Sequence, residues 1–149
     1  MRHAFTMIEL IFVIVILGIL AAVAIPKLSA TRDDALITRM SQTISVAVGE
    51  IASYAVARGE TTADLTVMSN SVESLVTRNE ATLDVPNSAV DIIMGTRPNC
   101  VRIAIVTSGE DENLTVILGP AGDALCDALH NIFDSAIFPM AVRGAQVVY

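Results

Sequence analysis

An unbroken run of apolar residues from Leu10 to Ile25, ended by Pro26, is the feature that most limits what this chain can fold into. Counted from Phe5, the segment has roughly 21 residues, and as a helix of about 31 Å it just spans the hydrocarbon core of a bilayer. Glu9 stands at the start of this segment. Because a charged side chain inside a bilayer costs about 2.5 kcal/mol or more, the carboxylate needs a partner. The sequence therefore predicts a membrane-spanning helix with one buried charge to neutralise.

The residues at the start of the run form a motif. A short basic leader, Met1-Arg2-His3-Ala4, is followed by Phe5-Thr6-Met7-Ile8-Glu9. This pattern resembles the N-terminal signature of type IV pilins and of the pseudopilins of type II secretion, in which a glycine precedes Phe-Thr-Leu-Ile-Glu and a long apolar segment. The chain departs from the usual form at two positions. Ala4 replaces the glycine, which puts a methyl group beside the bond to be cut, and Met7 replaces the commoner leucine.

The resemblance implies a route of processing and assembly. A prepilin peptidase would cut between Ala4 and Phe5, Phe5 would then be N-methylated, and the apolar segment would be kept. The subunit would wait in the lipid of the inner membrane as a single-pass protein with its globular domain outside the cytoplasm. An assembly platform and its ATPase would then extract it into a cell-surface or periplasmic filament, a homopolymer whose neighbours are other pilin or pseudopilin subunits.

The same resemblance assigns a role to Glu9. In these families the glutamate pairs with the free N-terminal amine of a neighbouring subunit, which here is the amine of Phe5, and the pair sets the register of the filament. Two opposite charges about 4 Å apart attract by about 4 kcal/mol at an effective dielectric constant of 20. The attraction offsets the cost of burial only when both charges are present.

Two ordinary targeting segments remain as alternatives for the N-terminus. Arg2 followed by the apolar run, with the small residues Ala22-Val23-Ala24 as a cleavage site, is the pattern of a secretory signal peptide. A plain signal anchor would have the same length and hydrophobicity. Glu9 argues against both, because neither kind of segment gains anything from an acidic residue between its basic end and its apolar core.

Composition indicates one small domain on a stalk. The chain has 149 residues and 53% hydrophobic content, which leaves room for one modest globular domain after the helix. The expected division is a leader at 1–4, a transmembrane or filament-core helix at 5–26, and an extracytoplasmic domain at 27–149. The net charge is −7 and the nine basic residues do not cluster, so no nucleic-acid partner is indicated.

Beyond Pro26 the apolar residues recur at helical spacing on one face, with charged residues between them. The face comprises Leu28, Leu36, Met40, Ile44, Ala47, Val48, Ile51 and Ala55. The pattern predicts a continuous or kinked helix from about Phe5 to Arg58, ended by Gly59. We expect a kink at Pro26, which cannot donate its backbone hydrogen bond.

Residues 60–99 are predicted to form a variable connecting loop. The resemblance to pilins and pseudopilins implies that this segment lies on the filament surface. A short helix at 72–77 is expected after an Asn or Ser cap. Pro86-Asn87 and Arg97-Pro98 are predicted to be turns. We assign no chemistry to this segment.

The remaining residues predict an antiparallel sheet. Residues 101–107 and 114–118 form a hairpin around the turn 108–113, Asp123 caps a short helix that ends near Phe133, and 137–142 with 145–149 supply one or two further strands. Together with the resemblance, this predicts an α+β, pilin-like fold. Its long N-terminal helix protrudes with a hydrophobic first half and packs by its second half on a small antiparallel sheet.

The two cysteines, Cys100 and Cys126, are expected to form a disulfide. Closing a loop of this size removes roughly 3 to 4 kcal/mol of chain entropy from the unfolded state. Many type IV pilins close a C-terminal loop in this way. Two unpaired buried cysteines are the alternative. A zinc site with His130 is disfavoured, because the three residues are too few and too irregularly spaced, and His130 is expected to have a structural, surface or half-buried position.

No catalytic motif is present, so the sequence predicts a structural subunit rather than an enzyme. Glu110, Asp111 and Glu112 are calcium candidates by chemistry, and major pseudopilins use calcium in a C-terminal loop. Their pattern lacks the alternating ligand spacing of an EF-hand, so we predict a solvated turn and no cofactor. A membrane-anchored extracytoplasmic binding module that does not assemble into a filament is the alternative function.

Overall fold

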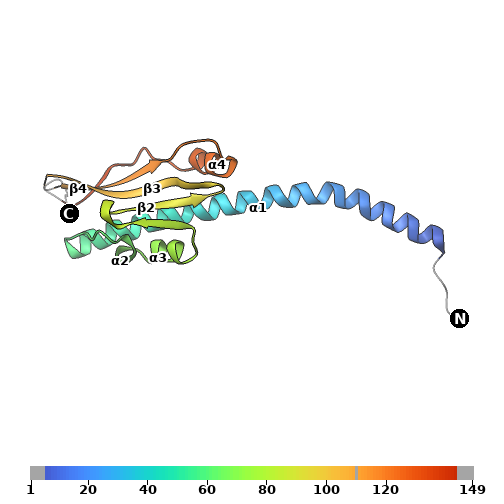
Figure 1. The fold of residues 1–149 in the computed structure, drawn as a ribbon, viewed down its shortest axis with the longest axis horizontal. Helices are drawn as coiled ribbons and strands as arrows, with labels where there is room; N and C mark the ends of the chain where they lie inside the picture. Colours follow the sequence, from blue (N-terminus) through green and yellow to red (C-terminus); the bar gives the residue numbers. More distant parts are fainter. Residues whose placement is uncertain (1–5, 110, 144–149) are drawn as a thin grey trace. The chain divides into compact units, whose positions relative to one another are not determined.

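The computed structural model describes residues 6–109 and 111–143. Figure 1 shows a long helix, α1, and a five-stranded sheet. Helix α1 runs from Met7 to Arg58. The chain divides into two compact units, residues 1–36 and 37–149, and α1 contributes to both. The α+β, pilin-like architecture predicted from the sequence is confirmed.

Helix α1 continues through Pro26 without a break in its helical assignment, so the proline does not end it. A kink at this position stays a prediction. The predicted end of the helix is confirmed, because Gly59 follows Arg58 with φ of +68° and donates its backbone N–H to the carbonyl of Ala55 at 2.9 Å. Glycine adopts this left-handed conformation without the steric cost that a side chain brings.

In the second unit, one face of α1 is buried and the other is exposed. Ile44, Ala47 and Ile51 have no exposed surface, whereas Val46 is 53% exposed. The buried positions recur at spacings of three or four, with one adjacent pair, Ala47 and Val48, which places them on one side of a helix. They are Ile37, Met40, Ile44, Ala47, Val48, Ile51 and Ala55. The amphipathic face predicted from the sequence is therefore the core face of α1, although Leu28 and Leu36 are not among its buried residues.

The segment after α1 differs from the predicted loop. It contains helix α2 from Leu65 to Met68, helix α3 from Asn70 to Thr77, strand β1 from Ala81 to Asp84 and strand β2 from Ala89 to Met94. The expected short helix is confirmed as part of α3, and its cap is Ser69, whose hydroxyl accepts a hydrogen bond from the backbone N–H of Val72. The loop prediction for 60–99 was wrong because β1 and β2, which pair with each other, have only four and six residues and show no clear strand pattern in the sequence.

Strands β3 and β4 form the predicted hairpin. β3 runs from Arg97 to Ser108 and β4 from Asp111 to Leu118, and β5 from Met140 to Arg143 completes the sheet. The order is β1-β2-β3-β4-β5, and every neighbouring pair is antiparallel. The part of the further strand expected at 145–149 lies outside the described residues.

Three local predictions in this sheet need correction. The turn lies at Gly95 and Thr96 rather than at Arg97-Pro98, which begin β3. Asp111 and Glu112 belong to β4, paired with Ser108 and Thr107, rather than to a long turn. Strand β5 starts at Met140, later than the expected residue 137. The predicted turn at Pro86-Asn87 is a short 3-10 helix from Val85 to Asn87.

The core is formed by one face of the sheet and the buried face of α1. Val90, Ile92, Val101 and Ile103 are fully buried, and the register pairs Val90 with Ile103 and Ile92 with Val101. Since side chains alternate across a strand, the intervening Asp91 and Arg102 lie on the opposite face. There Arg102 forms ion pairs with Asp91 at 2.9 Å and with Asp84.

Helix α4 runs from Ala124 to Ile132 and has the predicted N-cap, Asp123. One carboxylate oxygen of Asp123 accepts hydrogen bonds from the backbone N–H groups of Leu125 and Cys126, and the other accepts from the backbone and hydroxyl of Thr96. These bonds, led by those from Thr96, lower the pKa of Asp123 to about 2. Gly95 has room for no side chain, since a Cβ there would lie 2.2 Å from the Asp123 carboxylate. The carboxylate thus joins the β2–β3 turn to the start of α4.

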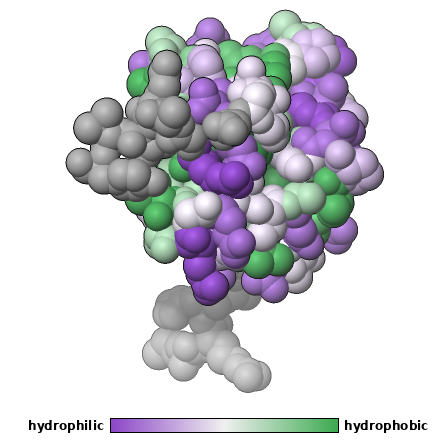
Figure 2. Space-filling model, turned by 90° about the vertical axis from the view of Figure 1, so that its left-hand side faces the viewer, coloured by the Kyte–Doolittle hydropathy of each residue, from purple (hydrophilic) through white to green (hydrophobic). Residues whose placement is uncertain are grey.

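The end of the second unit that includes the C-terminus of α1 has a mixed surface. Figure 2 shows hydrophilic and hydrophobic residues interspersed over this face. A mosaic of this kind is ordinary for protein surface in water, which is 55–60% apolar by area on average. This mixed surface contrasts with the first half of α1, where the residues from Leu10 to Ile25 are apolar.

Candidate functional site

The N-terminal half of α1 is the candidate functional site. All residues from Thr6 to Ile25 are exposed, and large apolar side chains such as Phe12 at 65% and Leu20 at 61% lie on every side of the helix. Among the described residues, α1 is the helix that is long and apolar enough to cross a membrane, and none of its most hydrophobic stretch is buried within the chain. A helix that is apolar all round needs a lipid or protein environment to cover it.

The acidic residue in the first turn of this helix is Glu9, which takes part in a capping box. The backbone N–H and the hydroxyl of Thr6 both donate to one carboxylate oxygen of Glu9, at 2.8 and 2.6 Å. In return, the Thr6 hydroxyl oxygen accepts from the backbone N–H of Glu9 at 3.4 Å. This reciprocal arrangement satisfies donors that the start of a helix leaves free.

The capping box is a partner for Glu9 that the sequence interpretation missed. That interpretation considered only an amine from another subunit. The spacing Thr6-x-x-Glu9 carries the signal, since Thr followed three residues later by Glu is the usual capping-box pattern. A hydrogen-bonded carboxylate still carries its negative charge. The capping box therefore explains how the helix starts, and it leaves the charge of Glu9 to be balanced.

Small residues lie together on one side of the exposed helix. Gly18, Ala21 and Ala22 are three or four positions apart, so they share a face, and Ala24 follows nearby. A Cβ atom built on Gly18 would meet nothing within 4 Å, so no contact within the chain requires a glycine there. Small side chains allow the backbones of two apolar helices to approach closely. This face is suited to packing against another helix.

Several predicted site residues cannot be placed. Ala4 and Phe5, the predicted cleavage and methylation positions, lie outside the described residues, as does Glu110 of the acidic group. Of the other calcium candidates, Glu112 is engaged on both oxygens: the Thr61 hydroxyl donates to one at 2.7 Å, and Arg143 donates to the other at 3.3 Å. Glu112 therefore ties β4 to β5 and to the segment after α1.

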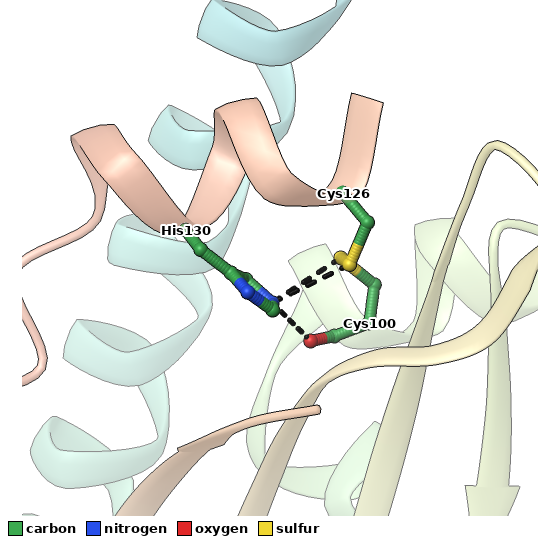
Figure 3. A group of neighbouring side chains, drawn as sticks. All are labelled: Cys100, Cys126 and His130. Atoms are coloured by element: carbon green, nitrogen blue, oxygen red, sulfur yellow. Dashed lines mark hydrogen bonds between the residues drawn. A yellow bond between two sulfur atoms is a disulfide. The ribbon is translucent and has the colours of Figure 1, made fainter. Parts of the chain in front are cut away.

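Cys100 and Cys126 form a disulfide, with their Cα atoms 5.7 Å apart. It links β3 to the first turn of α4, and both cysteines are fully buried. Figure 3 shows His130 beside this disulfide. Its Nε2 atom lies 2.7 Å from the carbonyl oxygen of Cys100, 3.4 Å from Sγ of Cys126 and 3.6 Å from Sγ of Cys100.

The three residues could group around a metal by distance alone, since their candidate ligand atoms lie within 4.8 Å of one another. Sequence spacing did not reveal this proximity. The sulfur atoms are bonded to each other, however, and only thiolates are strong metal ligands. In its disulfide form this group therefore lacks the donors of a zinc site.

An apolar groove of about 310 Å³ lies between α1 and the segment after α4. Phe133 and Phe138 stack in it with ring centroids 6.4 Å apart, while Ile137 remains 66% exposed. Ser41, Ser45 and Val48 supply the α1 side. The sequence analysis did not anticipate this groove, because it forms only when residues distant in sequence pack together.

Comparison with known families gives one match. Residues 1–25 match the family model described as the prokaryotic N-terminal methylation motif. The type IV pilin and pseudopilin signature identified at the N-terminus is thereby confirmed. Comparison with curated proteins finds no match, and comparison with solved structures finds none either.

Proposed function

We propose that this chain, which carries the type IV pilin and pseudopilin signature at residues 1–25, is a structural subunit that polymerises into a filament through the N-terminal half of α1. The observation that carries the proposal is the exposure of that half on every side, directly after the motif. A folded domain that worked alone in water would not leave such a surface uncovered.

The proposal accounts for two successive environments of the same helix. Before assembly, lipid covers residues 5–26 and the domain formed by 27–149 lies outside the cytoplasm. After a prepilin peptidase cuts between Ala4 and Phe5 and Phe5 is methylated, the platform and its ATPase move the subunit out of the membrane. In the filament the same apolar side chains are covered by the helices of neighbouring subunits, and the face with Gly18 permits close packing.

Glu9 provides the register in this proposal. The hydrogen bonds from Thr6 orient its carboxylate at the start of α1. A neighbouring Phe5 amine then supplies the balancing positive charge, in an environment from which water is excluded. A contact of one surface with a different surface of the next copy repeats without closing, and so it produces an open filament.

The first test concerns processing. We expect the mature chain to begin at Phe5 and to keep its apolar segment, because the basic leader directly precedes the motif. N-terminal sequencing or intact mass of the protein from the cell envelope measures this. A mature chain that begins at Ile25 would show that the N-terminus is an ordinary secretory signal peptide, and the filament proposal would then be abandoned.

The second test separates the charge of Glu9 from its capping role. Glu9→Gln keeps a side chain that can complete the capping box but removes the charge, whereas Glu9→Ala removes both. Breaking a buried ion pair typically costs about 3 to 5 kcal/mol. We therefore expect both variants to accumulate in the membrane and to yield no shear-released filaments.

Thr6→Val is the matched control, because it removes the hydroxyl of the capping box and leaves the charge of Glu9 in place. It should still assemble, with a reduced yield. If Glu9→Gln instead assembled like the wild type while Thr6→Val failed, Glu9 would be a helix cap and not the register charge.

A membrane-anchored binding module is the second candidate function, and the groove lined by Phe133 and Phe138 favours it. The two functions differ in what Glu9 does. A tether needs no register charge, so a binding module would act normally with Glu9→Ala and would not be found in shear-released material.

A further inference from the structure

His130 is placed to act on the two cysteines before they are joined. We propose that His130 activates the thiol of Cys126, so that Cys126 is the first of the two cysteines to react when the disulfide forms and Cys100 is the second. The proposal rests on the position of the imidazole against both sulfur atoms and does not depend on filament assembly.

The Cys126–His130 pair requires only one helical turn. The two residues are four positions apart on α4, so they lie on the same face of the helix as soon as it forms. Cys100 comes from β3 and reaches the pair only when α4 packs against the sheet. The imidazole is therefore beside Cys126 at an earlier stage than Cys100 is.

Burial sets the order of events. Both cysteines have no exposed surface in the folded chain, so an external oxidant reaches a thiol only before α4 is packed in place. At that stage Cys126 has His130 as its neighbour. Cys100 lies in a strand with no histidine, since the remaining histidine of the chain is His3 in the leader.

The hydrogen bonds of the Cys100 carbonyl define which atom of His130 faces the sulfurs. A carbonyl oxygen can only accept, so the contact of 2.7 Å means that Nε2 of His130 carries a proton. The same oxygen also accepts from the backbone N–H of Gly119 at 2.8 Å. In the packed structure that N–H is directed at the carbonyl oxygen of Cys100, and Sγ of Cys126 lies 3.4 Å from the same nitrogen. Before Cys100 is in place, the imidazole N–H is free to donate to the Cys126 thiolate and stabilise it.

Other charges near Cys126 act in both directions. Cys126 lies in the first turn of α4, and its backbone N–H donates to Asp123. A helix N-terminus favours a thiolate, but the carboxylates of Asp123 and Asp127 oppose it. The nearby N–H donor that distinguishes Cys126 from an ordinary helix-start cysteine is His130.

The reaction is a thiol–disulfide exchange with a disulfide-bearing oxidant. Cys126 loses its thiol proton to solvent, and its thiolate, hydrogen-bonded by His130, attacks one sulfur of the oxidant. The disulfide of the oxidant breaks. The sulfur that was not attacked leaves and takes up a proton, and the attacked sulfur stays bonded to Cys126 in a mixed disulfide. Cys100 then loses its proton and attacks Sγ of Cys126. This attack releases the remaining sulfur of the oxidant, which takes up a proton. Two electrons pass from the cysteines to the oxidant, which ends as two thiols.

The full chain in detergent micelles is reduced, unfolded in urea and then diluted into oxidised glutathione at neutral pH, so that each thiol meets the oxidant before α4 packs against the sheet. Cys100→Ser leaves Cys126 as the single thiol, and Cys126→Ser leaves Cys100. The rate at which glutathione attaches to each is measured by acid quenching and mass spectrometry. Adding His130→Phe, which keeps a ring but has no N–H, should slow the reaction of Cys126 about tenfold, since the thiolate loses its hydrogen-bond donor, and should leave the reaction of Cys100 unchanged.

His130→Gln is the conservative control, since its amide keeps an N–H donor and should therefore restore most of the rate at Cys126. The glutamine amide can still donate to the carbonyl of Cys100, so the oxidised protein should unfold at the same denaturant concentration as the wild type. Peptide mapping of the oxidised wild type should return the Cys100–Cys126 pair. Equal rates for Cys126 with and without His130, or a matching loss at Cys100, would overturn the proposal.

Discussion

Helix α1 contains two halves that share a backbone conformation and differ in what covers them. In residues 7–25 every side chain is exposed, and Ile16, one of the least exposed, still has 41% of its surface accessible. In residues 37–58 one face is completely buried, and Ile44 has no accessible surface. The helix itself is continuous between them. The difference therefore lies in the distribution of apolar residues around the helix and not in its backbone.

This comparison indicates which forces each half depends on. The second half is amphipathic, and it gains stability from packing within its own chain, as most helices of globular proteins do. The first half gains no stability from packing against the rest of the chain. Its apolar surface must be covered by lipid or by other subunits, so substitutions there should change membrane insertion or assembly and leave the unfolding of the domain unaffected.

A matched pair of isoleucines gives the largest expected effect. Ile44→Ala should lower the free energy of unfolding by about 2 to 5 kcal/mol, because it opens a cavity in the core. Ile16→Ala should leave that free energy unchanged, since Ile16 has no packing within the chain to lose. Urea unfolding of both variants in detergent, followed by circular dichroism of the sheet, measures the difference. If the two variants lost stability equally, the division of α1 into two halves would be incorrect.

A polar contact of the second half gives the next largest effect. The carboxylate of Glu50 accepts hydrogen bonds from the Ser69 hydroxyl at 2.5 Å and from the backbone N–H of Ser71 at 3.0 Å, which joins α1 to the start of α3. Burial alone would raise the pKa of Glu50, but these hydrogen bonds outweigh it and lower the pKa. Glu50→Ala leaves the donors unpaired and should cost about 1 to 3 kcal/mol of unfolding free energy.

The control for this prediction is Glu60→Ala, which removes an exposed glutamate just beyond the end of α1. Both variants change the net charge by the same amount. A similar small loss in the two would mean that charge, and not the bond to α3, determines the effect of Glu50.

Features that depend on local sequence could be predicted, and features that depend on distant partners could not. The extent of α1, the cap of α4 by Asp123 and the β3–β4 hairpin follow from periodicity and from the residues at the ends of the elements. Strand β1 has four residues and is held by its pairing with β2, while Arg102 of β3 bridges acidic side chains from both. Strands β1 and β2 are neighbours in sequence, but they have only four and six residues. The ion pairs of Arg102 span 18 and 11 residues, and no local pattern indicates them.

The candidate site shows the same limit. The motif around Glu9 could be identified from residue types and spacing alone, and its capping box with Thr6 could have been identified in the same way. The position of His130 against the disulfide could be predicted only in part from the sequence. Its spacing from Cys126 on one helix was visible in the sequence, but its contact with Cys100 depends on how α4 packs on β3.

Two arginines of α1 give the smallest expected effect and the last way to sharpen the comparison. Arg39, in the second half, forms an ion pair with Glu80 at 2.6 Å, whereas Arg32 is exposed in the first unit. The hydrogen bond from Arg39 is the main cause that lowers the pKa of Glu80. Because both side chains of the pair are partly exposed, Arg39→Ala should cost only about 0.2 to 1 kcal/mol at neutral pH, and Arg32→Ala should cost nothing.

The pH dependence identifies the origin of this small loss. A carboxyl group whose pKa is lowered by folding stabilises the folded state fully above its ordinary pKa, which is 4.5 for Glu80, and loses that contribution as the pH falls through the lowered value. The difference in unfolding free energy between the wild type and Arg39→Ala should therefore shrink as the pH falls below 4.5 and vanish once Glu80 is protonated in the folded state. Urea unfolding at a series of pH values measures it. A difference that stayed constant in acid would mean that Arg39 stabilises the domain by packing its aliphatic stem, and that its ion pair with Glu80 contributes nothing.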